Sequence, residues 1–293
     1  MMAIITISRG SYFRGKEIAQ KVAQKLGYDC ISREDLLKNS KEYNIPEIKL
    51  LHAFEHEPSI LDRFTHGKEK YIAYIQAVLL RQLSKDNVVY HGFAFHFFIK
   101  DMPCVLKVRI IAELEDRIKF VMERDKIPKK RASSFVRKID GQRRKWSQSL
   151  YGIDPSDPGL YDLVLLIGDI TTQDAVEIIS HVAGLKEFQT TSESKRIMSD
   201  LALAAEVKAA LVDLNTNIEV SAEGGIVAVK IEIPLAQDWE LMQEMMKIGE
   251  AIKGVKGINF FVEGLSHDAD LFRAIQPSLS TQSKIRTYFA EFG

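Results

Sequence analysis

A glycine-flanked segment near the N-terminus has the residue types that bind phosphate groups. Residues 10–16 (GSYFRGK) fit the G-x-x-x-x-G-K half of a P-loop. Glycines let consecutive backbone N–H groups turn inward onto phosphate oxygens, and the lysine neutralises phosphate charge. The next residue is Glu17, where the complete motif has a Ser or Thr whose hydroxyl holds Mg²⁺. The half-motif by itself is equally compatible with a tight turn that leaves Lys16 exposed.

A basic segment is the second candidate for chemistry. Residues 124–145 contain ten basic and two acidic residues, a net charge of +8, although the whole chain has a formal net charge of zero. Residues 198–293 have a net charge of −6 and residues 1–197 a net charge of +6. This balance argues against a uniformly basic nucleic-acid binder and against a highly charged disordered chain. The local excess indicates that the segment meets an anion, and the alternatives are a solvated helix face or a site for polyanions.

The elements around these residues alternate between strands and helices. An apolar run at 3–8 precedes the glycine segment, and apolar residues at helical spacing follow it as far as Gly27, which suits a left-handed cap. Ser32 can cap the next helix. Further strands are expected at 88–91, 105–111 and 163–167. Helices are expected at 115–123 and 172–182, and another helix is expected to cover the basic segment to about residue 147. The alternation predicts a three-layer α/β domain around a mainly parallel sheet.

A polar, aperiodic stretch at 186–197 is interpreted as a linker between residues 1–185 and a second domain at 198–265, and a polar tail follows at 266–293. The second domain has an expected helix at 200–212, strands at 218–221 and 226–233, a helix at 239–252 and a strand at 258–262. The order α-β-β-α-β predicts a small α+β domain. Its apolar residues 226–229 are expected at an exposed strand edge, which would favour pairing between subunits.

Two other patterns give no catalytic prediction. Residues 52–56 (HAFEH) spell the inverted zinc-protease motif, but Pro58 ends the helix and no downstream acidic ligand is recognisable, so no metal site is predicted. Cys30 and Cys104 suit buried free thiols of a reducing cytosol. The sequence has no uninterrupted 18-residue apolar stretch and no basic region of a signal peptide, so a cytoplasmic protein without a transmembrane segment is expected.

Six stretches of the first 185 residues resemble, in order, the cytidylate-kinase-like branch of the P-loop nucleoside monophosphate kinases. They are ITISRG, RGKEIAQKVAQKLGYDCISRE, VVYHGF, VLKVRIIAELEDRIKFVMERDKI, RKIDGQRRKW and YDLVL. The resemblance implies a P-loop NTPase fold and phosphoryl transfer from ATP to a nucleoside monophosphate, CMP or dCMP, with Mg²⁺. In this branch Glu17 is an expected variant of the motif.

The resemblance also assigns roles to individual residues. The ATP phosphates would contact Gly10, Ser11, Arg14, Gly15, Lys16 and Glu17, and the acceptor nucleotide would contact Ser32, Arg33, Asp140 and Arg143. The catalytic cations would be Lys16, Arg117 and Arg124, the two arginines bordering a mobile lid. Arginines suit phosphoryl transfer because planar, bidentate donors stabilise the charge that spreads over the equatorial oxygens.

One position departs from the family pattern. Gly92 is followed by Phe93, where the family has an arginine that contacts the acceptor phosphate. Its loss removes one or two charge-assisted hydrogen bonds, each worth about 1.5 to 3 kcal/mol, unless another cation such as Arg63 or Arg81 substitutes. Two hypotheses therefore stay open: an active kinase, and a catalytically weak or inactive nucleotide-binding sensor that signals through the second domain.

The second domain resembles a BON domain in its element order and in the segments EGGIVAVKIEI and GVKGINFFV. BON domains are associated with membranes or with oligomeric and ligand-binding roles. Anionic lipid would repel this net-negative domain, since attraction to such surfaces comes from Lys and Arg at about 1 kcal/mol each. We expect a regulatory role or formation of a homo-oligomer. The expected partner is a nucleoside monophosphate and not a nucleic acid.

Overall fold

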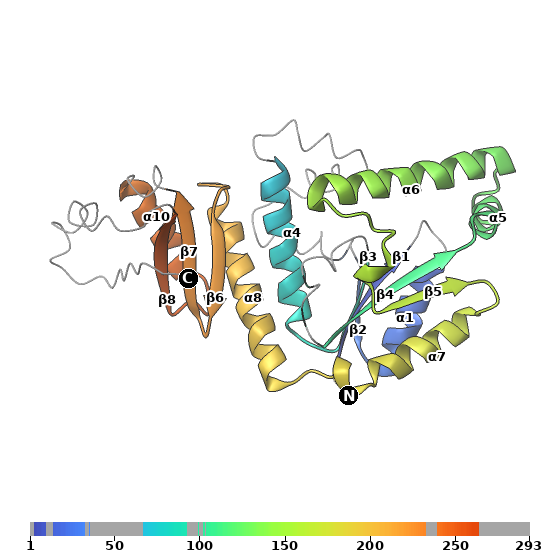
Figure 1. Cartoon of the computed structure of the whole chain (residues 1–293), viewed down its shortest axis with the longest axis horizontal. Helices are drawn as coiled ribbons and strands as arrows, with labels where there is room; N and C mark the ends of the chain where they lie inside the picture. Colours follow the sequence, from blue (N-terminus) through green and yellow to red (C-terminus); the bar gives the residue numbers. More distant parts are fainter. Residues whose placement is uncertain are drawn as a thin grey trace. The chain divides into compact units, whose positions relative to one another are not determined.

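The computed structural model describes residues 3–9, 14–32, 35, 67–92, 99, 102, 104–232 and 239–263. The chain divides into two compact units, Met1–Met198 (unit 1) and Ser199–Gly293 (unit 2). Unit 1 contains a five-stranded sheet and unit 2 a three-stranded sheet (Figure 1).

The sheet of unit 1 is parallel throughout, with strand order β2-β3-β1-β4-β5. The strands are β1 (Ile4–Arg9), β2 (Asp29–Ser32), β3 (Val88–Gly92), β4 (Val105–Ala112) and β5 (Leu163–Ile167). Strand β2 was not predicted from the sequence, because this edge strand is short and its residues are only half-buried or exposed. In a parallel sheet the carboxyl ends of all strands meet at one edge, and β1 lies at the centre of that edge.

Helices cover both faces of this sheet (Figure 1). α1 (Gly15–Leu26) and α7 (Thr172–Ala183) share one core with the strands. α4 (Gly67–Leu83) and α6 (Lys129–Tyr151) lie on the other side, where the rings of Tyr71 and Trp146 have their centroids 5.8 Å apart. The predicted three-layer α/β fold is confirmed. Gly27 ends α1 in the left-handed conformation, with φ 70°, as its position predicted.

α5 (Leu114–Asp125) follows β4 and packs against α6. Their shared core consists of Ile118, Val121, Ala132 and Val136, all at most 2% exposed. Burial of such side chains is worth about 1.5 to 3 kcal/mol each for the larger residues. The described residues of unit 1 also form 3₁₀ turns at Pro158–Leu160 (η4) and Lys186–Phe188 (η5).

Unit 2 has the predicted α-β-β-α-β order. Its elements are α8 (Ser192–Leu211), β6 (Glu219–Glu223), β7 (Ile226–Glu232), α10 (Trp239–Glu250) and β8 (Gly257–Glu263). Both helices contribute to one core with the sheet. α8 begins inside the stretch interpreted as a linker, because Thr191 Oγ1 accepts a hydrogen bond from Ser194 N at 3.1 Å and so caps the helix. The boundary between the units therefore falls within α8.

The expectation of an exposed edge at residues 226–229 is wrong. These residues belong to β7, which is the central strand and pairs with β6 antiparallel and with β8 parallel. The run is apolar because it is a core strand: Val227 and Val229 are 0% exposed. The backbone groups of β7 are already used in the sheet, so they cannot pair two subunits.

The entry of the chain into α1 requires a residue without a side chain. A Cβ atom on Gly15 would lie 2.7 Å from Cβ of Arg9, closer than real Cβ contacts allow. Arg14, the residue before it, is in the left-handed region with φ 40°. Gly15 thus lets the first turn of α1 approach the end of β1.

Gly15→Ala should destabilise the protein by about 1 to 3 kcal/mol, because the atom at closest approach belongs to the start of the Arg9 side chain and cannot rotate away. Gly141→Ala is the matched control, since nothing lies within 4 Å of the added Cβ in α6. The control should stabilise by about 0.5 to 1 kcal/mol through helix propensity. Calorimetric melting of both variants measures the two effects, and equal melting temperatures for Gly15→Ala and the wild type would contradict the close packing.

Thr171→Ala should destabilise α7 by about 1 kcal/mol, because Thr171 and Asp174 form a capping box. Thr171 Oγ1 accepts from Asp174 N at 3.1 Å, and the Asp174 carboxylate accepts from Thr171 N at 2.9 Å. Thr171→Ser keeps the hydroxyl and should melt like the wild type. The hydrogen bonds from Thr171 lower the pKa of Asp174, so the capping contribution is present above the ordinary Asp pKa and is lost as pH falls through the lowered value. Melting curves against pH should show the wild-type advantage shrinking only in acid.

Candidate active site

The carboxyl end of β1 brings together several of the predicted phosphate-binding residues. α1 begins there at Gly15, and Lys16 is exposed in its first turn. The first N–H groups of a helix have no partner within the helix and carry a partial positive charge, which favours an anion at this point. Arg14 extends to the start of α7, where its Nη1 donates to Thr172 Oγ1 at 3.4 Å. Gly10 and Ser11 lie outside the described residues.

Glu17 forms a surface ion pair with Lys21, which is not one of the predicted site residues. Its Oε1 lies 2.8 Å from Nζ of Lys21, one turn further along α1. Both side chains are more than 40% exposed, at 48% for Glu17 and 44% for Lys21. A carboxylate in the first turn is also favoured by the helix dipole.

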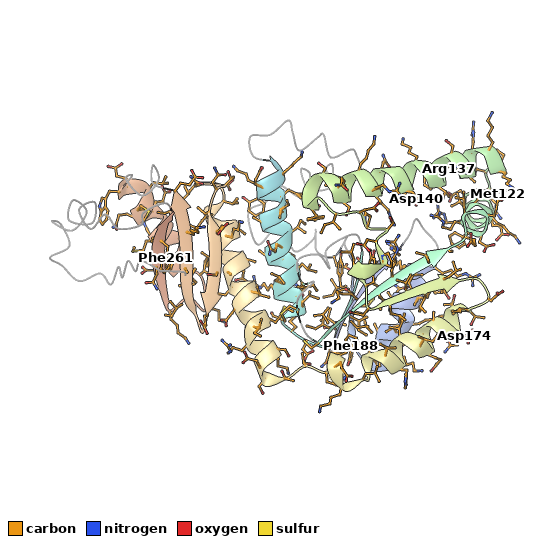
Figure 2. All side chains as sticks on the ribbon, viewed as in Figure 1. Met122, Arg137, Asp140, Asp174, Phe188 and Phe261 are labelled. Carbon is orange, nitrogen blue, oxygen red and sulfur yellow. The ribbon has the colours of Figure 1, made fainter. Side chains whose placement is uncertain are left out.

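α5 and α6 bring a second group of predicted residues to the same end of β1. Arg117 Nη1 of α5 lies 2.7 Å from Asp140 Oδ2 of α6. Arg143 is one turn after Asp140, and its Nη1 donates to the backbone carbonyl of Arg9 at 2.5 Å. Arg9 is the last residue of β1, directly before the glycine segment. α6 is therefore tied to the carboxyl end of β1, and Figure 2 labels Asp140 on this helix.

Arg124 and Ser32 have local partners. Arg124 makes two bonds of 2.6 Å to the carboxylate of Asp125 at the end of α5, and this hydrogen bonding lowers the pKa of Asp125. Ser32 Oγ accepts from Asp35 N at 3.2 Å, which confirms the predicted cap. Outside the described residues lie Arg33, Arg63, Phe93 and 52–56, while Arg81 is exposed on α4.

A polar group beside β1 was not predicted from the sequence. Arg109 of β4 lies in register with Ser8. Its guanidinium carbon is 5.3 Å from the centroid of the Tyr161 ring, and its Nη1 donates to the Tyr161 hydroxyl at 3.2 Å. That hydroxyl donates to the Pro155 carbonyl at 2.9 Å. The signal was present as two cations, Lys107 and Arg109, two residues apart in an apolar strand.

The loop after α6 adds a carboxylate near this group. Hydrogen bonds from Ser156 lower the pKa of Asp154, with smaller contributions from Arg144 and Arg109. The loop is therefore held by polar contacts between the end of α6 and β4.

Neither cysteine has the environment of a nucleophile. Cys104 is buried, Cys30 is half-buried, and both are free thiols. Burial raises the pKa of both, so the thiol form dominates at neutral pH. Among the described residues, no group of three or more His, Cys, Asp or Glu side chains could hold a metal ion. No helix in the same part of the chain is long and apolar enough to cross a membrane.

Comparison with known proteins places this geometry in a family. A model of the cytidylate kinase-like family matches residues 4–168. Cytidylate kinase from Archaeoglobus fulgidus is 26% identical over 187 residues, which cover 63% of this chain and 97% of that protein. The crystal structure of an uncharacterized protein from Eubacterium ventriosum has a TM-score of 0.50 and 22% identity, covering 62% of this chain and 98% of that one, and shares the fold. The family match spans more than half of the chain and includes all five strands of the unit 1 sheet. The chain therefore belongs to the cytidylate kinase-like family.

Proposed function

We propose that this protein transfers a phosphoryl group from ATP to a nucleoside monophosphate, with CMP or dCMP as the acceptor. Membership of the cytidylate kinase-like family supports nucleotide kinase activity. The main observation behind the proposal is that α1 and α6 each place a cationic side chain near the carboxyl end of β1. Lys16 lies in the first turn of α1, and Arg143 of α6 is bonded to the Arg9 carbonyl.

The groups around the start of α1 fit the polyphosphate of ATP. They are backbone N–H groups and the cations Lys16 and Arg14, which bind anions from several directions. When bound, Mg²⁺ would neutralise charge between the phosphates. Glu17 is engaged with Lys21, so the described residues offer no direct ligand set for Mg²⁺, and phosphate oxygens and water would hold the ion.

The α5 and α6 residues fit the stabilisation of charge during transfer. Asp140 holds the Arg117 guanidinium in one orientation through the 2.7 Å ion pair. Arg143 is held at the carboxyl end of β1 by the bond from its Nη1 to the Arg9 carbonyl, and a guanidinium carries five N–H donors in a fixed planar arrangement. Fixed guanidinium donors stabilise the charge on the equatorial oxygens without reorganising in the transition state.

Lys16→Ala should lower kcat by at least about 100-fold without unfolding the protein, because a lysine in contact with the transferred charge is lost. Lys21→Ala is the matched control on the same helix and should change kcat less than twofold. ADP production measured with CMP, dCMP, UMP and AMP tests both variants and the acceptor. The proposal fails if the wild type forms no ADP with any of these acceptors.

Asp140→Asn should reduce kcat/KM for the acceptor by about 10- to 100-fold, the loss expected from a charge-assisted bond of about 1.5 to 3 kcal/mol. Asp125→Asn breaks the comparable pair with Arg124 at the exposed end of α5 and should cost less than threefold. Steady-state kinetics distinguishes the two pairs. Equal losses in the two variants would mean that the Arg117–Asp140 pair has no special role in the reaction.

The alternative function is a nucleotide-binding sensor that signals through unit 2. Phe93 in place of an arginine supports it, as does α8, which begins in unit 1 and ends in unit 2. The α-β-β-α-β order of unit 2 supports a BON-like domain with a regulatory or self-associating role. Stabilisation by ATP without turnover, together with an oligomeric state that changes with nucleotide, would favour the sensor over the kinase.

A further inference from the structure

Three pairs of adjacent cations repeat along α6. They are Lys130-Arg131, Arg137-Lys138 and Arg144-Lys145, each pair seven residues after the last. All six side chains are exposed. Seven residues are close to two helical turns, or about 10.5 Å along the axis, so the pairs form a row on one face of the helix. We call these six residues the α6 cation row.

The opposite face of α6 is fixed against the rest of unit 1. Ala132 and Val136 are 0% exposed and Trp146 is 6% exposed. Asp140 and Arg143 are half-buried and bonded to Arg117 and Arg9. These contacts hold the helix so that the cation row faces outward, and Figure 2 labels Arg137 on this helix.

Carboxylates do not neutralise the cation row. In the part of the chain that the structure describes, only Arg144 has a carboxylate partner, Asp154, at 3.8 Å. The one acidic residue within α6 is Asp140, which pairs with Arg117. A helix face stabilised by its own charges alternates their signs at three- or four-residue spacing, whereas like charges repel. A bound polyanion would relieve the repulsion within the row.

We propose that the α6 cation row binds the phosphate backbone of duplex DNA without reading its sequence. The row spans about 21 Å, a length over which a DNA duplex carries about 12 phosphate charges. The major groove of B-DNA is about 12 Å wide and admits an α-helix, while that of A-form RNA is too narrow. Because the helix backbone is already folded, binding to a regular array of phosphates orders only the cationic side chains and not the backbone.

Side chains between the pairs disfavour other polyanions. The exposed positions there are Ser134 and Gly141, and the exposed residues Gln148 and Ser149 follow the last pair. They offer no exposed aromatic ring on which the bases of a single strand could stack. They also offer no apolar side chain that would enter a lipid surface. The row lies on the side of α6 away from Asp140 and Arg143, so this proposal does not rest on the kinase proposal.

The test measures binding of the full chain to a fluorescein-labelled DNA duplex about two helical turns long, by anisotropy at salt concentrations from about 50 to 200 mM. The test variant, Lys130→Gln/Arg137→Gln/Lys145→Gln, removes one cation from each pair. The control variant, Lys186→Gln/Lys247→Gln/Lys253→Gln, removes the same charge from exposed lysines elsewhere. The test variant should bind at least about tenfold more weakly and lower the slope of log K against log salt by about 2 to 3, since each phosphate contact contributes about 0.9. The control should stay within twofold of the wild type.

The proposal is overturned if the wild type does not bind the duplex at about 50 mM salt or shows a slope below about 3. Equal weakening by the two variants would overturn it as well, since net charge would then account for the effect. Tighter binding to duplex RNA, to single-stranded DNA of the same length or to vesicles of anionic phospholipid would assign the row to a different partner. Circular dichroism checks that both variants are folded. ADP production by the test variant should equal that of the wild type, so a loss of DNA binding can be distinguished from a failure of the kinase proposal.

Discussion

Gly15 packs directly against Arg9, so the chain passes from the central strand β1 into α1 within a space that no side chain could share. This contact sets where the N-terminus of α1 lies relative to the carboxyl edge of the sheet. The backbone N–H groups of that first turn and the side chain of Lys16 are fixed with it. The position of the site therefore follows from one steric constraint at the junction of two regular elements.

α6 is organised around the same junction. Its inner face carries the apolar residues that pack on α5 and the polar residues that reach Arg117 and the Arg9 carbonyl. Its outer face carries cations in a seven-residue repeat. A single helix thus separates two kinds of positive charge. The inner arginine is bonded in place at the end of β1, and the outer residues face solvent with little compensation.

Hydrophobic periodicity was sufficient to predict most of the fold. Strand β5 and the order of elements in unit 2 followed from apolar runs and their spacing, because burial on one or both faces leaves that pattern in the sequence. β2 was missed because half-buried edge residues leave no such run. The start of α8 was missed because its cap, Thr191 with Ser194, is polar like a linker. The error at β7 arose because an apolar run reports burial and does not say which strands lie beside it.

The half-motif of a phosphate loop, the alternation of strands and helices, and the positive charge of residues 124–145 can all be read from the sequence, because composition and periodicity are local properties of the chain. Which charges meet depends on the folded chain. It paired Arg117 with Asp140, bonded Arg143 to the end of β1, engaged Glu17 with Lys21, and placed Arg109 beside Ser8. These partners depend on side-chain directions and on strand order, and long-range packing fixes both.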